Sequence, residues 1–133
     1  MRYMLLIYSK EQAGATREML DEVYRGHRAT MQEAGRKGIL QGAEPLAPTS
    51  TATTVRVENG KAVVTDGPFA ETKEQLAGYY ILECQNLDEA IDWAGRIPTG
   101  CKGAEGCIEI RPLPGVPQRP ELDSVAAARA RNG

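Results

Sequence analysis

The stretch LAGYYILECQNLDEAIDWAGRIP, residues 76–98, decides the fold class because it holds a strand followed directly by a helix. Its first nine residues place apolar side chains on both faces of an extended chain, which is typical of a strand buried on both sides. Asn86 is then a predicted N-cap, Glu89 completes a capping box and Pro98 ends the helix. The predicted buried stripe of this helix is Leu87, Ala90, Ile91, Ala94 and Ile97.

The N-terminal part of the chain has the same order of elements. MRYMLLIY, residues 1–8, is again apolar on both faces and predicts a second doubly buried strand. Thr16 is a plausible N-cap and Gly38 a C-terminal stop, so a helix is expected between them. Its predicted inward face is Leu20, Tyr24, His27, Met31 and Ala34.

The remaining segments predict two short strands and a hairpin. GILQGAEPLAP, residues 38–48, indicates a short strand that runs into a Pro-rich loop, and CIEIRPL, residues 107–113, indicates a last strand after a Gly-rich loop. Between them, Asn59-Gly60 joins TTVRVE to KAVVTD and is typical of a two-residue type I′ hairpin. The predicted fold class is therefore α+β, a ferredoxin-like βαββαβ chain with an inserted β-hairpin.

The two doubly apolar strands also predict a partner. Two helices can cover only one face of a four-stranded antiparallel sheet, so something else must cover the other face. A second copy packed sheet to sheet is the simplest answer because most homo-oligomers are two-fold symmetric. We therefore expect a homodimer.

Length and composition exclude several classes of protein. With 133 residues, 41% hydrophobic and 26% charged, the chain predicts one globular domain over residues 1–113 and a Pro-punctuated tail, residues 114–133, that lies over a surface or a partner. A net charge of -2 argues against direct nucleic-acid binding. No apolar run is long enough to span a membrane and no signal peptide is recognisable, so a cytoplasmic location is expected.

The chain offers no recognisable cofactor motif. Its three cysteines include no CxxC pair, which favours free thiols over a zinc site. P-loop, dinucleotide, HExxH and GxSxG patterns are all lacking from the sequence, and no cofactor is expected.

His27 is the single histidine of the chain and its most convenient proton carrier near neutral pH. One interpretation is that its ring packs at the edge of the core, with one nitrogen bonded to a carbonyl. The other is an acid/base pair, in which a carboxylate orients the ring. Asp66 is the first candidate for that carboxylate.

Asp66 itself has two interpretations. Asp66-Gly67-Pro68 is typical of a turn, yet a carboxylate at the end of a hairpin arm could also project into a cleft. Lys73 follows in a charged run that indicates a solvated face, or else a site for an anionic ligand. Tyr79 and Tyr80 point to opposite faces of one strand; we select Tyr79 as a ligand-binding candidate, with core packing as the alternative for both.

The chain resembles the DGPF branch of the YCII-related (YciI-like) bacterial proteins. The residues that carry the resemblance are MRYMLLIY, GILQGAEPLAP, TVRVENGKAVVTDGPFAETKEQ, the stretch that continues to Pro98, and CIEIRPL. The resemblance implies a dimeric α+β barrel of ferredoxin-like subunits and an active-site histidine, here His27, that is paired with an aspartate. Some DGPF proteins are encoded beside extracytoplasmic-function sigma factors.

The first helix of this chain lacks an acidic residue that YciI carries. Where YciI carries an acid near the end of the first helix, this chain has Ala34, Gly35, Arg36 and Lys37. Asp66 is the residue that could replace that acid.

Three hypotheses follow for the function. The first is an enzyme that transfers a proton on, or hydrolyses, a small polar molecule, with His27 as acid or base and Asp66 orienting it. The second is a non-catalytic module that uses Asp66, Lys73 and Tyr79 to bind a metabolite or to associate with a sigma factor. The third is a structural dimer in which the Asp66 turn has no ligand.

Overall fold

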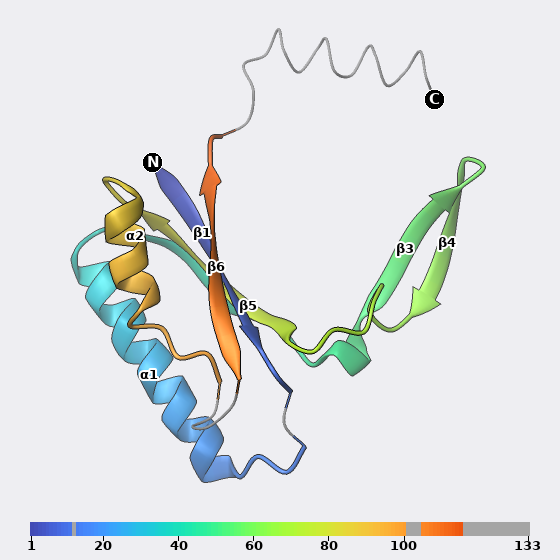
Figure 1. Ribbon diagram of the computed structural model, residues 1–133, viewed down its shortest axis with the longest axis horizontal. Coiled ribbons are helices and arrows are strands. Elements are labelled where there is room, and N and C mark those ends of the chain that lie inside the picture. Colours follow the sequence, from blue (N-terminus) through green and yellow to red (C-terminus); the bar gives the residue numbers. More distant parts are fainter. Residues whose placement is uncertain (12, 101–104, 116–133) are drawn as a thin grey trace, which may run out of the picture.

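The computed structural model describes residues 1–11, 13–100 and 105–115 (Figure 1). Its elements along the chain are β1 (Arg2–Ser9), α1 (Arg17–Arg36), β2 (Leu40–Pro45), a short 3-10 turn η1 (Thr49–Thr51), β3 (Thr53–Glu58), β4 (Lys61–Asp66), β5 (Gln75–Glu83), α2 (Leu87–Ala94) and β6 (Gly106–Leu113).

Four strands form an antiparallel sheet in the order β2-β5-β1-β6. The two doubly apolar strands, β1 and β5, are therefore the central pair. Both helices lie on the same face of this sheet (Figure 1). The result is a mixed α+β domain, consistent with a ferredoxin-like arrangement.

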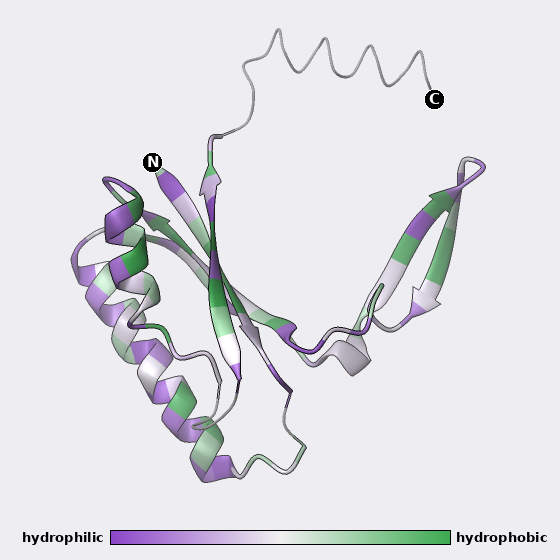
Figure 2. Cartoon of the chain, viewed as in Figure 1, coloured by the Kyte–Doolittle hydropathy of each residue, from purple (hydrophilic) through white to green (hydrophobic). Residues whose placement is uncertain are grey.

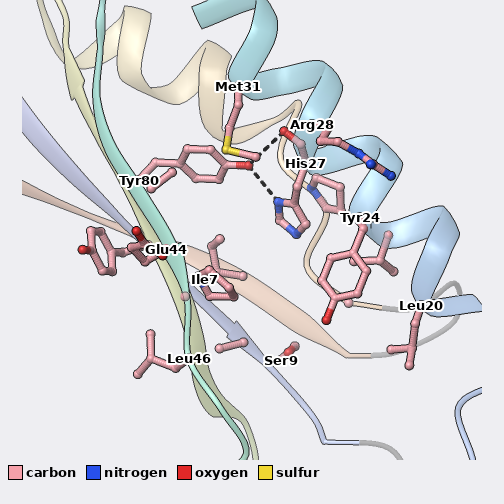
Figure 3. Close-up of a pocket in the computed structure, with 18 of the residues that line it drawn as sticks. Ile7, Ser9, Leu20, Tyr24, His27, Arg28, Met31, Glu44, Leu46 and Tyr80 are labelled. Carbon is pink, nitrogen blue, oxygen red and sulfur yellow. Dashed lines mark hydrogen bonds between the residues drawn. The ribbon is translucent and has the colours of Figure 1, made fainter. Parts of the chain in front are cut away.

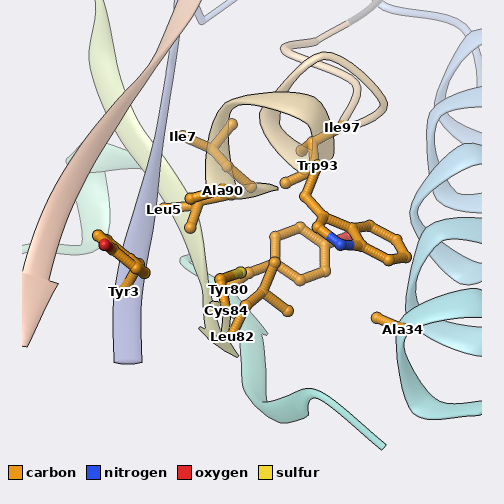
Figure 4. Packing of buried hydrophobic residues seen from close by; sticks show 10 residues of the cluster. All are labelled: Tyr3, Leu5, Ile7, Ala34, Tyr80, Leu82, Cys84, Ala90, Trp93 and Ile97. Atoms are coloured by element: carbon orange, nitrogen blue, oxygen red, sulfur yellow. The ribbon is translucent and has the colours of Figure 1, made fainter. Parts of the chain in front are cut away.

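The core lies between the sheet and the two helices (Figure 4). Alternate residues of the central strands point into it, and Leu5, Tyr80 and Leu82 are almost completely buried. The other buried apolar residues are Tyr3, Ile7, Ala34, Cys84, Ala90, Trp93 and Ile97. Alternation of buried and partly exposed residues along β1 and β5 means that the helices cover only one of the two apolar faces.

The start and the end of α1 agree with the sequence prediction, but its inward face does not. Thr16 caps the helix by accepting a hydrogen bond from the Met19 amide at 3.1 Å, and Gly38 has a φ of 75° just after the end. Leu20 and Tyr24, predicted to be inward, are 40% and 52% exposed. The first half of the predicted stripe therefore does not lie in the core.

Helix α2 also differs from its predicted stripe. Asn86 caps it through the Glu89 amide, as expected, but the helix ends at Ala94, with Gly95 as C-cap, rather than at Pro98. Leu87 and Ile91 are each 50% exposed, whereas Trp93 is 3% exposed. The helix is rotated so that the bulky indole ring, which the sequence stripe omitted, fills the core.

Two apolar surfaces of the described chain are not covered by a helix. The first is the open face of the sheet, which we define as the partly exposed residues Met4, Leu6, Tyr8, Tyr79 and Ile81. The second lies on the separate two-stranded sheet of β3 and β4, here called the ribbon, which projects away from the domain (Figure 1).

The ribbon is amphipathic. Asn59 and Gly60 have φ values of 51° and 76°, as a type I′ turn requires. The register pairs Val55 with Val64 and Val57 with Ala62, so these four residues share one face, and Figure 2 shows hydrophobic segments on both strands. Val57 is 74% exposed and Val64 62% exposed.

Some predictions fall on residues that the structure does not describe. Cys101 and part of the Gly-rich loop lie outside the described residues, as does all of the predicted tail after Gly115. Among the described cysteines, Cys84 is buried, Cys107 is exposed and both are free thiols. Among the described helices, none is long and apolar enough to cross a membrane.

Candidate functional site

A cavity of about 770 Å³ opens between α1 and the β2 edge of the sheet (Figure 3). Its inner wall is mainly apolar and includes Ile7, Met31, Ala43, Ala77 and Pro98. Ligand sites of small molecules are typically concave, apolar and supplied with a few polar groups. The dimensions and the lining of this cavity fit that description.

A hydrogen-bonded polar pair in the lining of the cavity is formed by His27 and Tyr80. His27 Nδ1 lies 2.8 Å from the Tyr80 hydroxyl, and the same hydroxyl lies 3.4 Å from the His27 carbonyl oxygen. The two rings are stacked, with centroids 5.9 Å apart. In Figure 3 the second ring nitrogen points away from Tyr80 and into the cavity. The pair thus holds the imidazole ring in one orientation.

The two contacts of the Tyr80 hydroxyl favour one tautomer of His27. A tyrosine hydroxyl has one hydrogen to donate. If Nδ1 carries the imidazole proton, it donates to the Tyr80 oxygen, and the hydroxyl donates to the His27 carbonyl, so that both contacts are hydrogen bonds. If Nδ1 is bare, the hydroxyl can serve only one of the two acceptors. The first arrangement leaves Nε2 as a free proton acceptor that faces the cavity.

Burial shifts the pKa of both groups toward the neutral form. It lowers the pKa of His27 below 6.5 and raises the pKa of Tyr80 to about 12. At neutral pH the imidazole is therefore uncharged and able to accept a proton, whereas the Tyr80 hydroxyl keeps its proton. The site meets the basic requirement of a general base, a neutral acceptor oriented toward a bound molecule.

Tight packing of α1 against the chain after α2 sets the position of His27. A Cβ atom on Gly26 would lie 2.7 Å from Cγ of Pro98, so only glycine fits at this contact. Four residues further on, the buried Thr30 hydroxyl contacts the carbonyl oxygens of Gly26 and Arg96 at 3.0 and 3.2 Å. His27 lies between these two anchors.

Glu11, in the loop after β1, forms hydrogen bonds that connect the segments near the mouth of the cavity. Its carboxylate accepts hydrogen bonds from the Thr49 amide at 2.8 Å and the Thr49 hydroxyl at 2.9 Å, while its own amide donates to the Gln75 side chain at 2.8 Å. Thr49 precedes the ribbon and Gln75 follows it. Leu46, at the cavity mouth just before Thr49, is thereby held close to β5, where its amide donates to the Ala77 carbonyl.

The structure does not bring Asp66 to His27 within one described chain. Asp66 ends β4 on the ribbon, opposite Thr53, and is exposed and outside the cavity lining. The turn after it is closed by a hydrogen bond from the Gly67 amide to the Ala52 carbonyl at 2.7 Å. Gly67 has a φ of 98°, a conformation that favours glycine.

The other two predicted ligand residues lie elsewhere. Lys73 is exposed and pairs with Glu105 at 3.1 Å. Tyr79 borders the cavity, but its register pairs it with Leu6 and Glu44, which places its side chain on the open face. The hydroxyl that reaches His27 belongs to its neighbour Tyr80, which pairs with buried Leu5.

Strand alternation would have pointed to Tyr80 only if the face of β5 that the helices cover had been known. Every second residue of β5 faces the helices. Tyr80 and Leu82 belong to this set, and Cys84 continues it just after the strand. Because His27 was expected on the inward face of its helix, the tyrosine in this set was the better partner. The sequence offers no comparable signal for Glu11 and Thr49.

The fold and the site together define a small α+β domain with a histidine-lined cavity between a helix and a sheet edge. The chain belongs to the YCII-related family, whose domain matches residues 1–114. It is also 39% identical over 115 residues to the uncharacterized protein R00369 of Rhizobium meliloti strain 1021, a match that covers 85% of this chain and 92% of that protein.

A solved structure with a related chain path is the 5-chloro-2-hydroxyhydroquinone dehydrochlorinase TftG of Burkholderia phenoliruptrix AC1100, in complex with 2,5-dihydroxybenzoquinone. The sequences are 16% identical, the TM-score is 0.45, and the match covers 87% of this chain and 96% of TftG. This degree of similarity transfers no activity from TftG to the present chain.

Proposed function

We propose that this chain is a small-molecule enzyme in which His27 Nε2 acts as a general base toward a substrate bound in the cavity. The observation that carries the proposal is the 2.8 Å contact between His27 Nδ1 and the Tyr80 hydroxyl at the wall of that cavity. A base must be neutral, oriented and within reach of the proton that it removes, and the first two conditions are met before any ligand binds.

Tyr80 is the positioning residue in this proposal. It accepts the Nδ1 proton, which leaves the Nε2 lone pair for the substrate. When His27 becomes protonated, the hydrogen bond to Tyr80 is kept, because Nδ1 donates in both forms. Tyr80 therefore takes the role that an aspartate has in other histidine pairs, but without a negative charge.

Asp66 has no part in the orientation of His27 within one chain under this proposal. Its place on the ribbon, away from the cavity lining, supports a turn role instead. The His27–Asp66 pair would require the ribbon of a second copy to reach the cavity.

Solvent exchange tests the proposed function without knowledge of the natural substrate. The protein is incubated in D₂O with a panel of small hydroxyketones and hydroxyesters, and loss of the proton on the carbon next to the carbonyl is followed by ¹H NMR. We expect the parent to accelerate exchange of at least one compound, and His27→Gln to lower that rate by about a hundredfold or more. Tyr80→Phe should also lower the rate, because the imidazole loses the contact that orients it, and Tyr79→Phe is its matched control, because the Tyr79 side chain points to the open face.

If compounds bind in the cavity but none exchanges faster than in buffer, the base proposal is wrong. The cavity would then be a non-catalytic metabolite-binding site.

We also propose that the chain functions as a homodimer. The open face consists of partly exposed apolar side chains on the two central strands, and the ribbon presents a second apolar face. A two-fold interface is self-complementary, so the same apolar sheet face can supply both of its sides. Packing of two open faces would give the dimeric α+β barrel expected from the sequence resemblance.

A further inference from the structure

None of the charged residues in the described lining of the cavity is buried. The charged residues among its described lining are Lys10, Glu11, Asp21, Arg28 and Glu44, and each of them is exposed. Apart from these charged residues, the polar side chains of the described lining are the His27–Tyr80 pair, Ser9, Tyr24 and Tyr79. A charged ligand placed there would lose water without gaining a buried partner of opposite charge, which is costly.

The entrance is apolar and is formed from two sides. Leu20 and Tyr24 project from α1, and Leu46 lies across from them after β2 (Figure 3). These side chains are 40%, 52% and 44% exposed, so they keep large apolar areas in contact with water. A ligand that covered them would remove this area from water, which is favourable.

The free nitrogen of His27 restricts the polar group of the ligand. In the tautomer favoured by the Tyr80 contacts, Nε2 is an acceptor, so the group that meets it must be a donor.

We propose that the cavity binds an uncharged molecule whose apolar body packs between Tyr24 and Leu46 and whose hydroxyl group donates to His27 Nε2. This inference deepens the proposed function and rests on it for the choice of tautomer. It replaces the polar substrate expected from the sequence with one that is mainly apolar.

Three cyclohexane derivatives that differ in charge test the inference. They are cyclohexanol, which is neutral, cyclohexanecarboxylate, and cyclohexylamine as its ammonium ion. Each is titrated into the parent protein at pH 7.5 while the ring signals of the single histidine are followed by NMR. We expect cyclohexanol to bind at least about tenfold more tightly than either ion, a conservative figure for the cost of burying an unpaired charge. Equal or tighter binding of an ion, or no response of His27 to cyclohexanol, would overturn the inference.

Tyr24→Ala tests the entrance, and Ile91→Ala is its control. Both residues are about half exposed on a helix, but Ile91 lies on α2, outside the cavity lining. We expect Tyr24→Ala to weaken cyclohexanol binding by about fivefold through lost apolar contact and Ile91→Ala to leave it unchanged. Equal affinities of the two variants would contradict the assignment of the entrance.

Failure of this inference can be told apart from failure of the proposed function. Probe binding depends on the charge and shape of the cavity and needs no reaction. Solvent exchange depends on His27 as a base. If an ion binds more tightly than cyclohexanol and exchange still depends on His27, the proposed ligand class is wrong and the proposed base is kept. If cyclohexanol binds as expected but no compound exchanges, the ligand class is kept and the proposed base is wrong.

Discussion

Burial makes His27 a source of pH-dependent stability. Since its pKa is lowered in the folded state, the unfolded chain binds a proton more readily around pH 6. The free energy of unfolding therefore falls as the pH drops below 6.5, and this loss stops once the pH is below the folded-state pKa. Above about pH 7.5 both states hold a neutral imidazole, so the effect vanishes.

We predict that His27→Gln removes this part of the pH dependence. The measurement is urea unfolding of the parent and the variant at pH 5.0, 6.0, 7.0 and 8.0. The stability of the parent relative to the variant should rise from pH 5.0 to 7.0 and then stay constant. A constant difference over the whole range, or a parent that gains relative stability at low pH, would show that burial does not lower the His27 pKa.

At the scale of the element, α1 contains two glycines with different surroundings. An added Cβ would lie 2.7 Å from Pro98 at Gly26, but would meet nothing within 4 Å at Gly35. Alanine is favoured over glycine within helices by up to about 1 kcal/mol. Gly35→Ala should therefore stabilise the protein, by an amount within that limit.

Gly26→Ala should instead destabilise the protein by about 1–3 kcal/mol, because α1 and Pro98 must move apart. Thermal and urea unfolding of both variants measure the difference. If Gly26→Ala stabilises the protein as much as Gly35→Ala does, close packing at Pro98 does not set the position of α1, and the anchor proposed for His27 is wrong.

For the helices, the sequence predicts where each begins better than which residues are buried. Caps at Thr16 and Asn86 involve only neighbouring residues, so both helix starts could be predicted. Which helix residues are buried could not be predicted, because apolar residues at helical spacing form the same pattern whether they face a core or a cavity. Leu20 and Tyr24 line a cavity, and on α2 the large side chain that is buried is Trp93 rather than Ile91.

The candidate site was only half predicted for a related reason. His27 was identified because it is the single histidine, but its partner is 53 residues away. Local turn chemistry drew attention to Asp66, whereas the pairing of α1 with β5 depends on the packing of the whole domain. Strand parity distinguishes Tyr80 from Tyr79 only when the helix-covered face is known.

At the scale of the whole molecule, the open face should hold two copies together. We predict that the parent has twice the mass of one chain at micromolar concentration, and that Leu6→Glu is monomeric because a carboxylate would be buried without a partner. Ile91→Glu is the control, since Ile91 is half exposed on the helix side. Analytical ultracentrifugation gives the mass. A monomeric parent, or a Leu6→Glu variant that stays dimeric, would contradict the proposed interface.

The most direct test of the central claim is the NMR titration of His27 in the parent, Tyr80→Phe and Asp66→Asn. If Nδ1 donates to Tyr80, the hydrogen bond favours the imidazolium, so Tyr80→Phe should lower the His27 pKa, and Asp66→Asn should leave it unchanged. A higher pKa in Tyr80→Phe would mean that the hydroxyl donates to Nδ1 and that Nε2 is not the free base. A lower pKa in Asp66→Asn would mean that the aspartate, not Tyr80 alone, controls the imidazole.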